Sequence, residues 1–176
     1  IKQKHWSPFQ MASMCVEIRT TRAISPQILR HSSFGFQEFS QRYANSNAIG
    51  TAKVPHLRAQ DYKNRQNSTD DLQQKLGKPK LADYHRRIAI MFEDAEHLYQ
   101  EMLSDGVAKE SARFVLPLAA PTKLFMCGTL RSWLHYINLR TANGTQQEHK
   151  EIAEQCKTIF QEQFPVISEA MCNELS

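Results

Sequence analysis

The segment that begins at Met14 most constrains how this chain can fold. Apolar residues occupy every second position from Met14 to Ile18, and this period of two predicts a strand with one buried face. Ser25-Pro26 then has the composition of a helix N-cap followed by the first helical position. We therefore expect a short helix over residues 27–30, followed by an extended segment.

A dense polar run, RHSSFGFQEFSQRY, occupies residues 30–43 and begins at this junction. It brings two guanidiniums close to a carboxylate and a hydroxyl, and arginine forks match phosphate geometry in a bidentate way. The residues alone support an anion site and a solvated charged strand about equally, because charged side chains usually lie on the surface.

Helical periodicity dominates the second half of the chain. Apolar residues recur at a spacing of three to four from Ile88 to Met102, and Asp105-Gly106 ends this pattern, which predicts a long amphipathic helix. We expect a shorter helix over 107–116, stopped by Pro117.

Three further helices are expected towards the C-terminus. Pro121-Thr122 opens one that runs to about Leu139 and carries Arg131 and His135 on one face. A capping box of Thr145 and Glu148 opens the next, with Ile152, Cys156, Ile159 and Phe160 facing a core. Pro165 ends that helix, and a short tail helix follows.

Residues 44–80 form a polar excursion with few apolar anchors, and we expect it to be mobile in the absence of a ligand. Seven Lys or Arg residues against three Asp make residues 53–80 basic, which suits anionic ligands or a solvated loop.

Composition limits the number of domains. A chain of 176 residues that is 41% hydrophobic is expected to form one domain, residues 1–176. The elements expected above make it α+β, with many helices and a small antiparallel sheet. No apolar run approaches a membrane span, and nothing at the start resembles a signal peptide, so we expect a soluble cytoplasmic protein. The cysteines show no metal spacing and are expected to be reduced core residues. Scattered glycines exclude a GxGxxG loop and a Walker loop.

The polar run resembles the signature of the flavin-dependent, or alternative, thymidylate synthase family. That signature is Arg-His-Arg, seven residues, then Ser-x-Arg-Tyr, and here Arg30 and His31 are followed by Ser40, Arg42 and Tyr43. HWSPFQ from His5 resembles the family's His-x-Ser/Thr-Pro-Phe-Glu. SARFVLP from Ser111, TLRSWLHYINLR, TQQE and FPVISEA also resemble family segments in the same order.

The chain departs from the family pattern at four positions. Ser32 replaces the second arginine of the signature, Thr129 replaces an asparagine found in many members, His135 replaces an asparagine found in some, and Gly144 replaces a common histidine. Family members also have several tens of residues before the position of His5, so we expect an N-terminal helix and strand of the family to be missing from this sequence.

The resemblance implies a reaction and an assembly. Family members convert dUMP to dTMP with 5,10-methylenetetrahydrofolate as carbon donor and NADPH-reduced FAD as hydride source, and they use no cysteine nucleophile. They assemble as homotetramers with sites shared between subunits. For this chain, the expected partners are therefore dUMP and further copies of itself, with no membrane, no nucleic acid and no metal.

The resemblance also implies site residues by position. Arg140 matches the residue against the uracil edge, although a helix C-terminal arginine that neutralises the dipole is an alternative. The dUMP-binding set is Gln27, Ile28, Leu29, Arg30, Glu38, Phe39, Ser40, Gln41, Arg42, Arg113 and Arg140. The FAD-binding set is Ser7, Arg30, His31, Ser32, Glu38, Thr129, Leu130, Arg131 and His135, and His5 lies at the folate and flavin face.

Two alternatives remain. One is a catalytically weakened family member, because Ser32 and Thr129 both replace flavin-side groups. A different class is a non-enzymatic basic domain that binds single-stranded nucleic acid through residues 53–80 and neighbouring aromatics.

Overall fold

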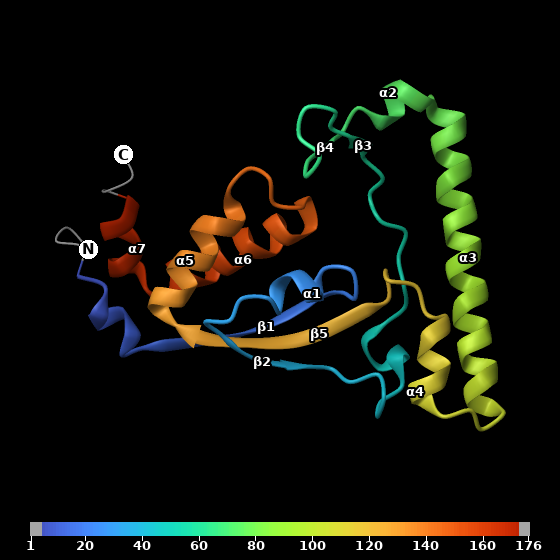
Figure 1. Cartoon of the computed structure of the whole chain (residues 1–176), viewed down its shortest axis with the longest axis horizontal. Coiled ribbons are helices and arrows are strands. Elements are labelled where there is room, and N and C mark those ends of the chain that lie inside the picture. Colours follow the sequence, from blue (N-terminus) through green and yellow to red (C-terminus); the bar gives the residue numbers. More distant parts are fainter. Residues whose placement is uncertain (1–4, 173–176) are drawn as a thin grey trace. The chain divides into compact units, whose positions relative to one another are not determined.

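Three strands form the principal sheet, in the order β1 (Ser13–Thr21), β5 (Pro121–Thr129) and β2 (Gly35–Glu38). This computed structural model describes residues 5–172. At one end of the β1–β5 pair, the Leu130 amide donates to the Ala12 carbonyl at 3.0 Å, and at the other the Arg22 amide donates to the Ala120 carbonyl at 2.9 Å. The start of β1 therefore lies beside the end of β5, so the pair is antiparallel (Figure 1). This confirms the α+β class with a small antiparallel sheet.

The expected strand near Met14 is confirmed as β1. Residues Met14, Val16 and Ile18 are buried, and the residues between them are exposed.

The helix expected over 121–139 is wrong in its first half, where residues 121–129 form β5. Thr122, Leu124 and Met126 are all buried while their neighbours are not, which is the period of two that a strand requires. β1 and β2 pair with β5 on its two sides, so this central strand has backbone partners that a sequence window does not contain. The helix begins only at Leu130, where the Thr129 side chain accepts a hydrogen bond from the Ser132 amide at 3.2 Å.

Contacts divide the chain into two compact units. Unit 1 consists of residues 1–18, 27–37 and 125–176, and unit 2 consists of residues 19–26 and 38–124.

Unit 1 packs helices on its share of the sheet. These are α5 (Leu130–Thr141), α6 (Gln147–Gln163) and α7 (Pro165–Cys172), and η1 (Ser7–Gln10) precedes β1. α5 and α6 lie side by side (Figure 1). Trp133 and Tyr136 are fully buried, and the Trp133 indole donates to the Met14 carbonyl at 2.9 Å. Phe34 packs so closely on Gly128 that a Cβ there would lie 2.4 Å from its ring, which explains the glycine.

Two local expectations in unit 1 need correction. The N-cap of α6 is Gln146 without a side-chain cap bond, so the predicted capping box of Thr145 and Glu148 does not form. Instead the side-chain amide of Gln146 donates to the Glu148 carboxylate at 3.0 Å. The buried face of α6 also differs, because Ile159 is exposed while the buried residues are His149, Ala153, Cys156 and Phe160. Pro165 begins α7, as expected for a tail helix.

The short helix near Ser25 lies two residues earlier than expected, as α1 (Ser25–Ile28). The Ser25 hydroxyl is buried and donates to the Glu38 carboxylate at 2.7 Å. A tertiary contact therefore takes the hydroxyl that was expected to cap the helix.

Unit 2 is built around α3 (Lys78–Ser104). The helix starts ten residues before the first apolar position of the predicted pattern. It ends at Ser104, just before Asp105-Gly106, as expected. Gly106 has φ 85°, its amide bonds the Leu103 carbonyl, and the Val107 amide bonds the Met102 carbonyl at 2.8 Å. This pair of bonds is a Schellman motif, in which a left-handed glycine satisfies the last carbonyls of a helix.

The remaining elements of unit 2 are short. They are η2 (Ser46–Ile49), the antiparallel pair β3 (Ala59–Gln60) and β4 (Ser68–Thr69), α2 (Leu72–Leu76), α4 (Lys109–Ala112) and η3 (Arg113–Val115). The polar excursion 44–80 thus contains only short elements, apart from the first turn of α3. The helix expected over 107–116 is shorter and ends as a 3-10 turn before Pro117.

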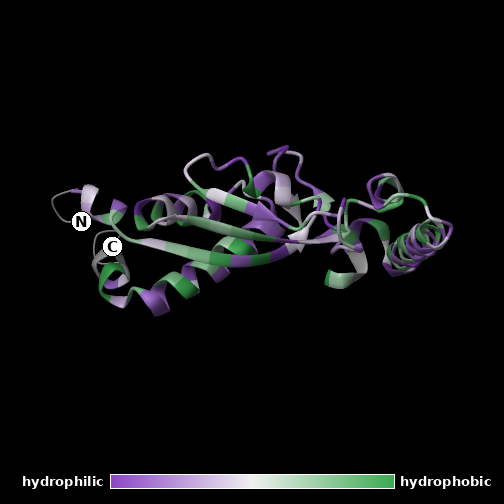
Figure 2. Ribbon diagram, turned by 90° about the horizontal axis from the view of Figure 1, so that it is seen from below, coloured by the Kyte–Doolittle hydropathy of each residue, from purple (hydrophilic) through white to green (hydrophobic). Residues whose placement is uncertain are grey.

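Apolar side chains on α3 are unusually exposed. Tyr99 is its one residue that is buried, whereas Ile90, Met91 and Leu98 are 45%, 56% and 46% exposed. Hydrophobic and hydrophilic residues alternate around the helix in Figure 2. In residues 5–172 no helix is both long enough and apolar enough to span a bilayer.

The cysteines are only partly as expected. Cys156 is buried, but Cys15 and Cys127 are exposed and are not core residues. Both lie on the outward positions of half-buried strands, where the alternation places every second residue in solvent. The side chain of Cys172 lies outside the described residues.

Candidate functional site

Unit 1 brings two of the predicted site residues into direct contact. The Arg140 Nε donates to His31 Nε2 at 2.9 Å, although the two residues are 109 positions apart. His31 follows α1 in a turn, and Arg140 lies in the last turn of α5. A guanidinium has five N–H donors and this bond uses one of them, so Arg140 can be held by His31 and still present its fork to a ligand.

The same contact defines the protonation of His31. The pKa of His31 is lowered from its usual 6.5 to about 4, chiefly by burial and also by the nearby charges of Arg140 and His135. Arginine can only donate, so Nε2 of His31 must be the acceptor and the ring proton lies on Nδ1. His31 is therefore a neutral imidazole with a defined tautomer at neutral pH.

Behind this pair lies a buried polar contact that the sequence did not indicate. The Tyr136 hydroxyl lies 3.1 Å from Nε2 of His149, and the His31 ring packs edge-on against Tyr136 at 4.9 Å. Burial lowers the pKa of His149 to about 4 and raises the pKa of Tyr136 above its usual range. Both groups are uncharged at neutral pH, and they support the ring that holds Arg140.

The other residues of the FAD-binding set in unit 1 fall into two groups. Arg30, Arg131 and His135 are exposed, as are Ser32 and His5, so their side chains are accessible to a ligand. Thr129 is different because its hydroxyl caps α5 and lies 3.1 Å from the Ser132 hydroxyl. Thr129 is thus the N-cap of α5, a role for which asparagine is equally suited.

These residues fit the chemistry of a flavin dinucleotide. Arg30 and Arg131 offer permanent cations for a pyrophosphate, and His31 and His135 offer hydrogen-bonding groups. A ligand can reach the exposed side chains of Arg30, Arg131 and His135. Leu130 is 2% exposed and offers only its backbone.

In unit 2, Arg42 and Arg113 of the dUMP-binding set both contact Glu110. Arg42 forms an ion pair with Glu110 at 3.3 Å, and the Arg113 Nε donates to the Glu110 carbonyl at 3.3 Å. Lys109, the neighbour of Glu110 on α4, donates to the Tyr43 carbonyl at 3.2 Å. Arg42 therefore contacts the Glu110 carboxylate, whereas Arg113 and Lys109 donate to backbone carbonyls, and Arg42 and Glu110 are about half exposed. An incoming phosphate can compete with the Glu110 carboxylate for Arg42.

Glu38 is held by three donors within unit 2. Its Oε1 accepts from Ser25 at 2.7 Å, from Thr122 at 2.9 Å and from Arg22 at 3.5 Å. Ser25 and Thr122 are both buried. The Glu38 carboxylate is consequently oriented by three residues that lie outside the polar run 30–43.

Gln41 and Ile28 belong to the dUMP-binding set but are buried. Gln41 is 4% exposed, and its side-chain amide nitrogen has no hydrogen-bond partner among the described residues. An unpaired buried amide costs free energy, so this position is a candidate for ligand or water contact. Ile28 is fully buried, which leaves only its backbone for a ligand. Gln27 donates to Gln146 at 2.6 Å within unit 1.

Three residues of the dUMP-binding set remain. Leu29, Phe39 and Ser40 are half-buried, and Phe39 bonds the Lys123 carbonyl through its amide at 2.7 Å. Ser7 lies in η1 at the surface.

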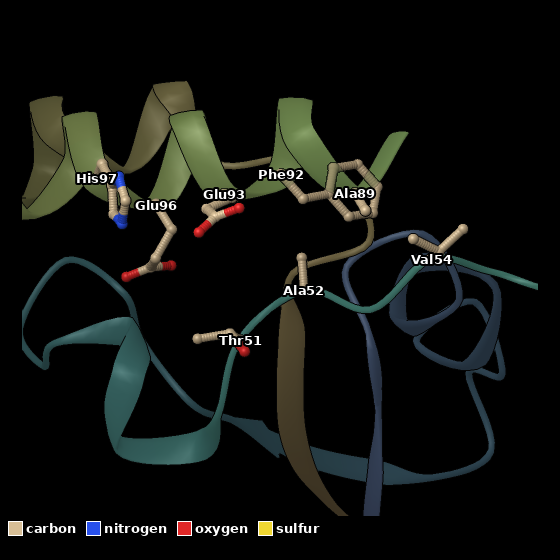
Figure 3. A pocket seen from close by; sticks show the side chains of 8 residues that line it. All are labelled: Thr51, Ala52, Val54, Ala89, Phe92, Glu93, Glu96 and His97. Atoms are coloured by element: carbon tan, nitrogen blue, oxygen red, sulfur yellow. The ribbon is translucent and has the colours of Figure 1, made fainter. Parts of the chain in front are cut away.

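Two cavities of unit 2 are lined by residues outside the predicted sets. One, of about 240 Å³, lies between residues 51–54 and α3, where Glu93, Glu96 and His97 come from the helix (Figure 3). The other, of about 420 Å³, is lined by basic and hydroxyl side chains that include Arg19, Lys53 and Lys123. Among residues 5–172, no group of His, Cys, Asp and Glu has the arrangement of a metal site.

Sequence reasoning missed Glu110, Lys109, Tyr136 and His149 as members of these clusters. Glu110 lies three residues before Arg113, which is one helical turn, so a search for charges one turn from each predicted site residue could have found it. The partners Tyr136 and His149 come from separate helices, and no local pattern connects them.

Comparison with known proteins gives a consistent set of relatives. A family model described as thymidylate synthase complementing protein matches residues 1–166. A probable flavin-dependent thymidylate synthase of Paramecium bursaria Chlorella virus 1 is 46% identical over 172 residues, which are 97% of this chain and 76% of the relative. A flavin-dependent thymidylate synthase of Synechocystis is also 46% identical, with the same coverage over 171 residues.

Solved structures agree. The UMP/dUMP methylase PolB of Streptomyces cacaoi, bound with 5-Br UMP, superimposes with a TM-score of 0.82 at 26% identity, covering 98% of this chain and 78% of PolB. The same enzyme bound with 5-Br dUMP gives a TM-score of 0.79, covering 98% and 76% of the two chains.

Proposed function

This chain belongs to the flavin-dependent thymidylate synthase family, and on that premise we propose that it methylates dUMP to dTMP. The carbon donor is 5,10-methylenetetrahydrofolate, and NADPH reduces the FAD cofactor. When bound, the flavin supplies the hydride, so the protein needs to orient ligands and stabilise charge. PolB, which is similar to 98% of this chain, is a UMP/dUMP methylase, and its structures hold brominated nucleotides.

The observation that carries this proposal is the hydrogen bond from Arg140 to His31. His31 belongs to the family signature, Arg140 matches the family position beside the uracil, and the fold joins them at 2.9 Å. A fixed cation beside N3 of the base favours its deprotonated form, and each pKa unit of that preference corresponds to about 1.4 kcal/mol. His31, being neutral, orients the guanidinium without adding charge.

We assign the nucleotide phosphate to Arg42 and Arg113. Charge-assisted bonds from guanidiniums to phosphate are among the strong hydrogen bonds of proteins. The ion pair with Glu110 holds Arg42 in place before the ligand arrives, and the carboxylate is exposed enough to move away.

We assign flavin binding to unit 1, in which Arg30, Arg131 and His135 are exposed. These two arginines supply permanent positive charge for the pyrophosphate of FAD. Ser32 supplies only a hydroxyl where the family has a further arginine.

We also propose that the chain assembles as a homotetramer. The exposed apolar residues Ile90, Met91 and Leu98 on α3 support this, because a helix of this length that buries only Tyr99 gains stability from a further partner. Size-exclusion chromatography with light scattering measures the assembly directly.

The decisive experiment is an assay of dTMP formation, or of tritium release from labelled dUMP. The purified chain is supplied with dUMP, FAD, NADPH and 5,10-methylenetetrahydrofolate. We expect dTMP only when all four are present, and omission of FAD or of the folate abolishes it. Failure of the complete mixture to yield dTMP contradicts the proposal.

A catalytically weakened member of the family is the second candidate, and it is favoured by Ser32 and Thr129, which both stand where other members have flavin-side groups. The visible absorbance of purified protein separates the two candidates, since a full member retains flavin and a weakened one loses it on dialysis.

A further inference from the structure

The two exposed cysteines of unit 1 lie directly opposite each other on adjacent antiparallel strands. The Leu130 amide bonds the Ala12 carbonyl, so residues 12 and 130 form a hydrogen-bonded pair. Each step forward along β1 is a step backward along β5, which places Cys15 opposite Cys127. The bond from the Arg22 amide to the Ala120 carbonyl, at the other end of these strands, has the same register.

The position within the ladder matters for the chemistry of the pair. Hydrogen-bonded and non-hydrogen-bonded pairs alternate along antiparallel strands, so the Cys15–Cys127 pair, three steps from residues 12 and 130, is non-hydrogen-bonded. In such a pair the Cα atoms are about 4.5 Å apart and the side chains are close. Disulfides need a Cα separation of roughly 4.4–6.8 Å, so this register can accept one without movement of the backbone.

The surroundings of the pair leave the sulfur atoms accessible. Both cysteines are exposed, and the neighbour of Cys127 on β2 is Gly35, which has no side chain to cover it. A hydrogen bond with the Cys127 thiol is the main cause that raises the pKa of Cys15 above its usual 9.0, so the two thiol groups are in contact.

We propose that Cys15 and Cys127 are a reversible redox site that forms an intramolecular disulfide across β1 and β5. The oxidant is a small-molecule disulfide of the glutathione type. One cysteine thiolate attacks the glutathione disulfide and releases one glutathione thiolate, which leaves a mixed disulfide on the protein. The facing cysteine then attacks that mixed disulfide, forms the Cys15–Cys127 bond and releases the second glutathione. The protein loses two protons and two electrons, and the glutathione disulfide is reduced to two thiols.

The location gives this site a connection to the rest of unit 1. Cys127 lies two residues before Thr129, the cap of α5, and α5 carries Arg131, His135 and Arg140. A bond at this point ties the end of β5 to β1. Because it closes a loop from residue 15 to residue 127, it also restricts the unfolded chain, so the oxidised protein should melt at a higher temperature than the reduced protein.

The test treats the full chain with oxidised glutathione under native conditions and analyses it by intact-mass and peptide mass spectrometry. We expect the wild-type protein to lose the mass of two hydrogens, to yield a linked pair of peptides containing Cys15 and Cys127, and to carry no glutathione on either. Dithiothreitol should restore the original mass and the lower melting temperature.

Two single variants provide the matched controls. Cys15→Ser should retain a stable glutathione adduct on Cys127, and Cys127→Ser should retain one on Cys15, because the resolving thiol is gone in each case. Buried Cys156 serves as an internal control and should stay unmodified in all three proteins.

Several outcomes would overturn the proposal. A persistent glutathione adduct on the wild-type protein would show that the thiols do not reach each other. No reaction in the native protein, with full reaction after denaturation, would show that the face is covered. A disulfide between two chains on a non-reducing gel would show that the pairing is not across this sheet.

Discussion

Arg140 and His31 are joined by a hydrogen bond of 2.9 Å in which the guanidinium donates to a neutral imidazole. The imidazole packs edge-on against Tyr136, which in turn contacts His149. A permanent cation at the end of α5 is thus positioned by an uncharged, half-buried group.

Replacement of Arg140 by alanine should lower turnover by orders of magnitude while the fold is kept, because the cation assigned to the uracil edge is lost. Steady-state assays of dTMP formation, with circular dichroism to confirm folding, measure this effect. Asn138→Ala, on an exposed position of the same helix, is the control and should leave turnover unchanged. Near-normal turnover of Arg140→Ala would mean that Arg140 only neutralises the helix dipole.

The same variant should raise the pKa of His31 above about 4, since a neighbouring positive charge that disfavours protonation is removed. The value should stay below 6.5, because burial is the larger cause of the shift. NMR titration of the His31 ring protons measures it. An unchanged pKa would show that Arg140 does not act on this imidazole.

Arg42→Ala should weaken dUMP binding roughly tenfold to a hundredfold, because a charge-assisted contact to phosphate is worth about 1.5–3 kcal/mol. Isothermal titration calorimetry gives the affinity. Glu110→Gln is the complementary variant, since it releases Arg42 from its ion pair, and it should leave the affinity unchanged or improve it. Equal affinities for wild type and Arg42→Ala would refute the phosphate assignment.

Ser32→Arg should tighten FAD binding by on the order of 1 kcal/mol or more, because it restores a permanent cation where the family has one. Ser32 is exposed in a turn, so a longer side chain has space there. Fluorescence titration with FAD measures the change. Ser33→Arg adds the same charge at the next exposed position and should have less effect. If Ser32→Arg binds FAD no better, the site is already adapted to serine.

Stability should fall as the pH decreases from 6.5 towards 4. The folded-state pKa of fully buried His149 is lowered to about 4, so between these values the unfolded chain binds a proton that the folded chain does not. The stability that this neutral histidine contributes is present above pH 6.5, and its loss across the window is at most about 3 kcal/mol. Chemical denaturation at a series of pH values measures it.

His149→Gln provides the control for this pH dependence. Glutamine can still bond the Tyr136 hydroxyl but does not titrate, so the variant should show a shallower loss over the same window. His31 contributes in the same direction and remains in the variant. An identical pH dependence in wild type and variant would rule out His149 as a source.

Local pattern was sufficient where a segment's environment follows from its own residues. The alternation from Met14 to Ile18 predicted β1, Asp105-Gly106 predicted the end of α3, and the signature at residues 30–43 indicated the family. Each of these depends on backbone preference or on side-chain period, which a short window of sequence contains.

Tertiary structure decided what depends on distant partners. Residues 121–129 became a strand because β1 and β2 supply their hydrogen bonds, and Ser25 turned from capping a helix to holding Glu38. Arg140 meets His31, and Cys15 faces Cys127, only because folding brings residues more than a hundred positions apart together. Periodicity shows which face of an element a residue occupies, but register and packing between elements arise from long-range contacts, and those set each residue's partner.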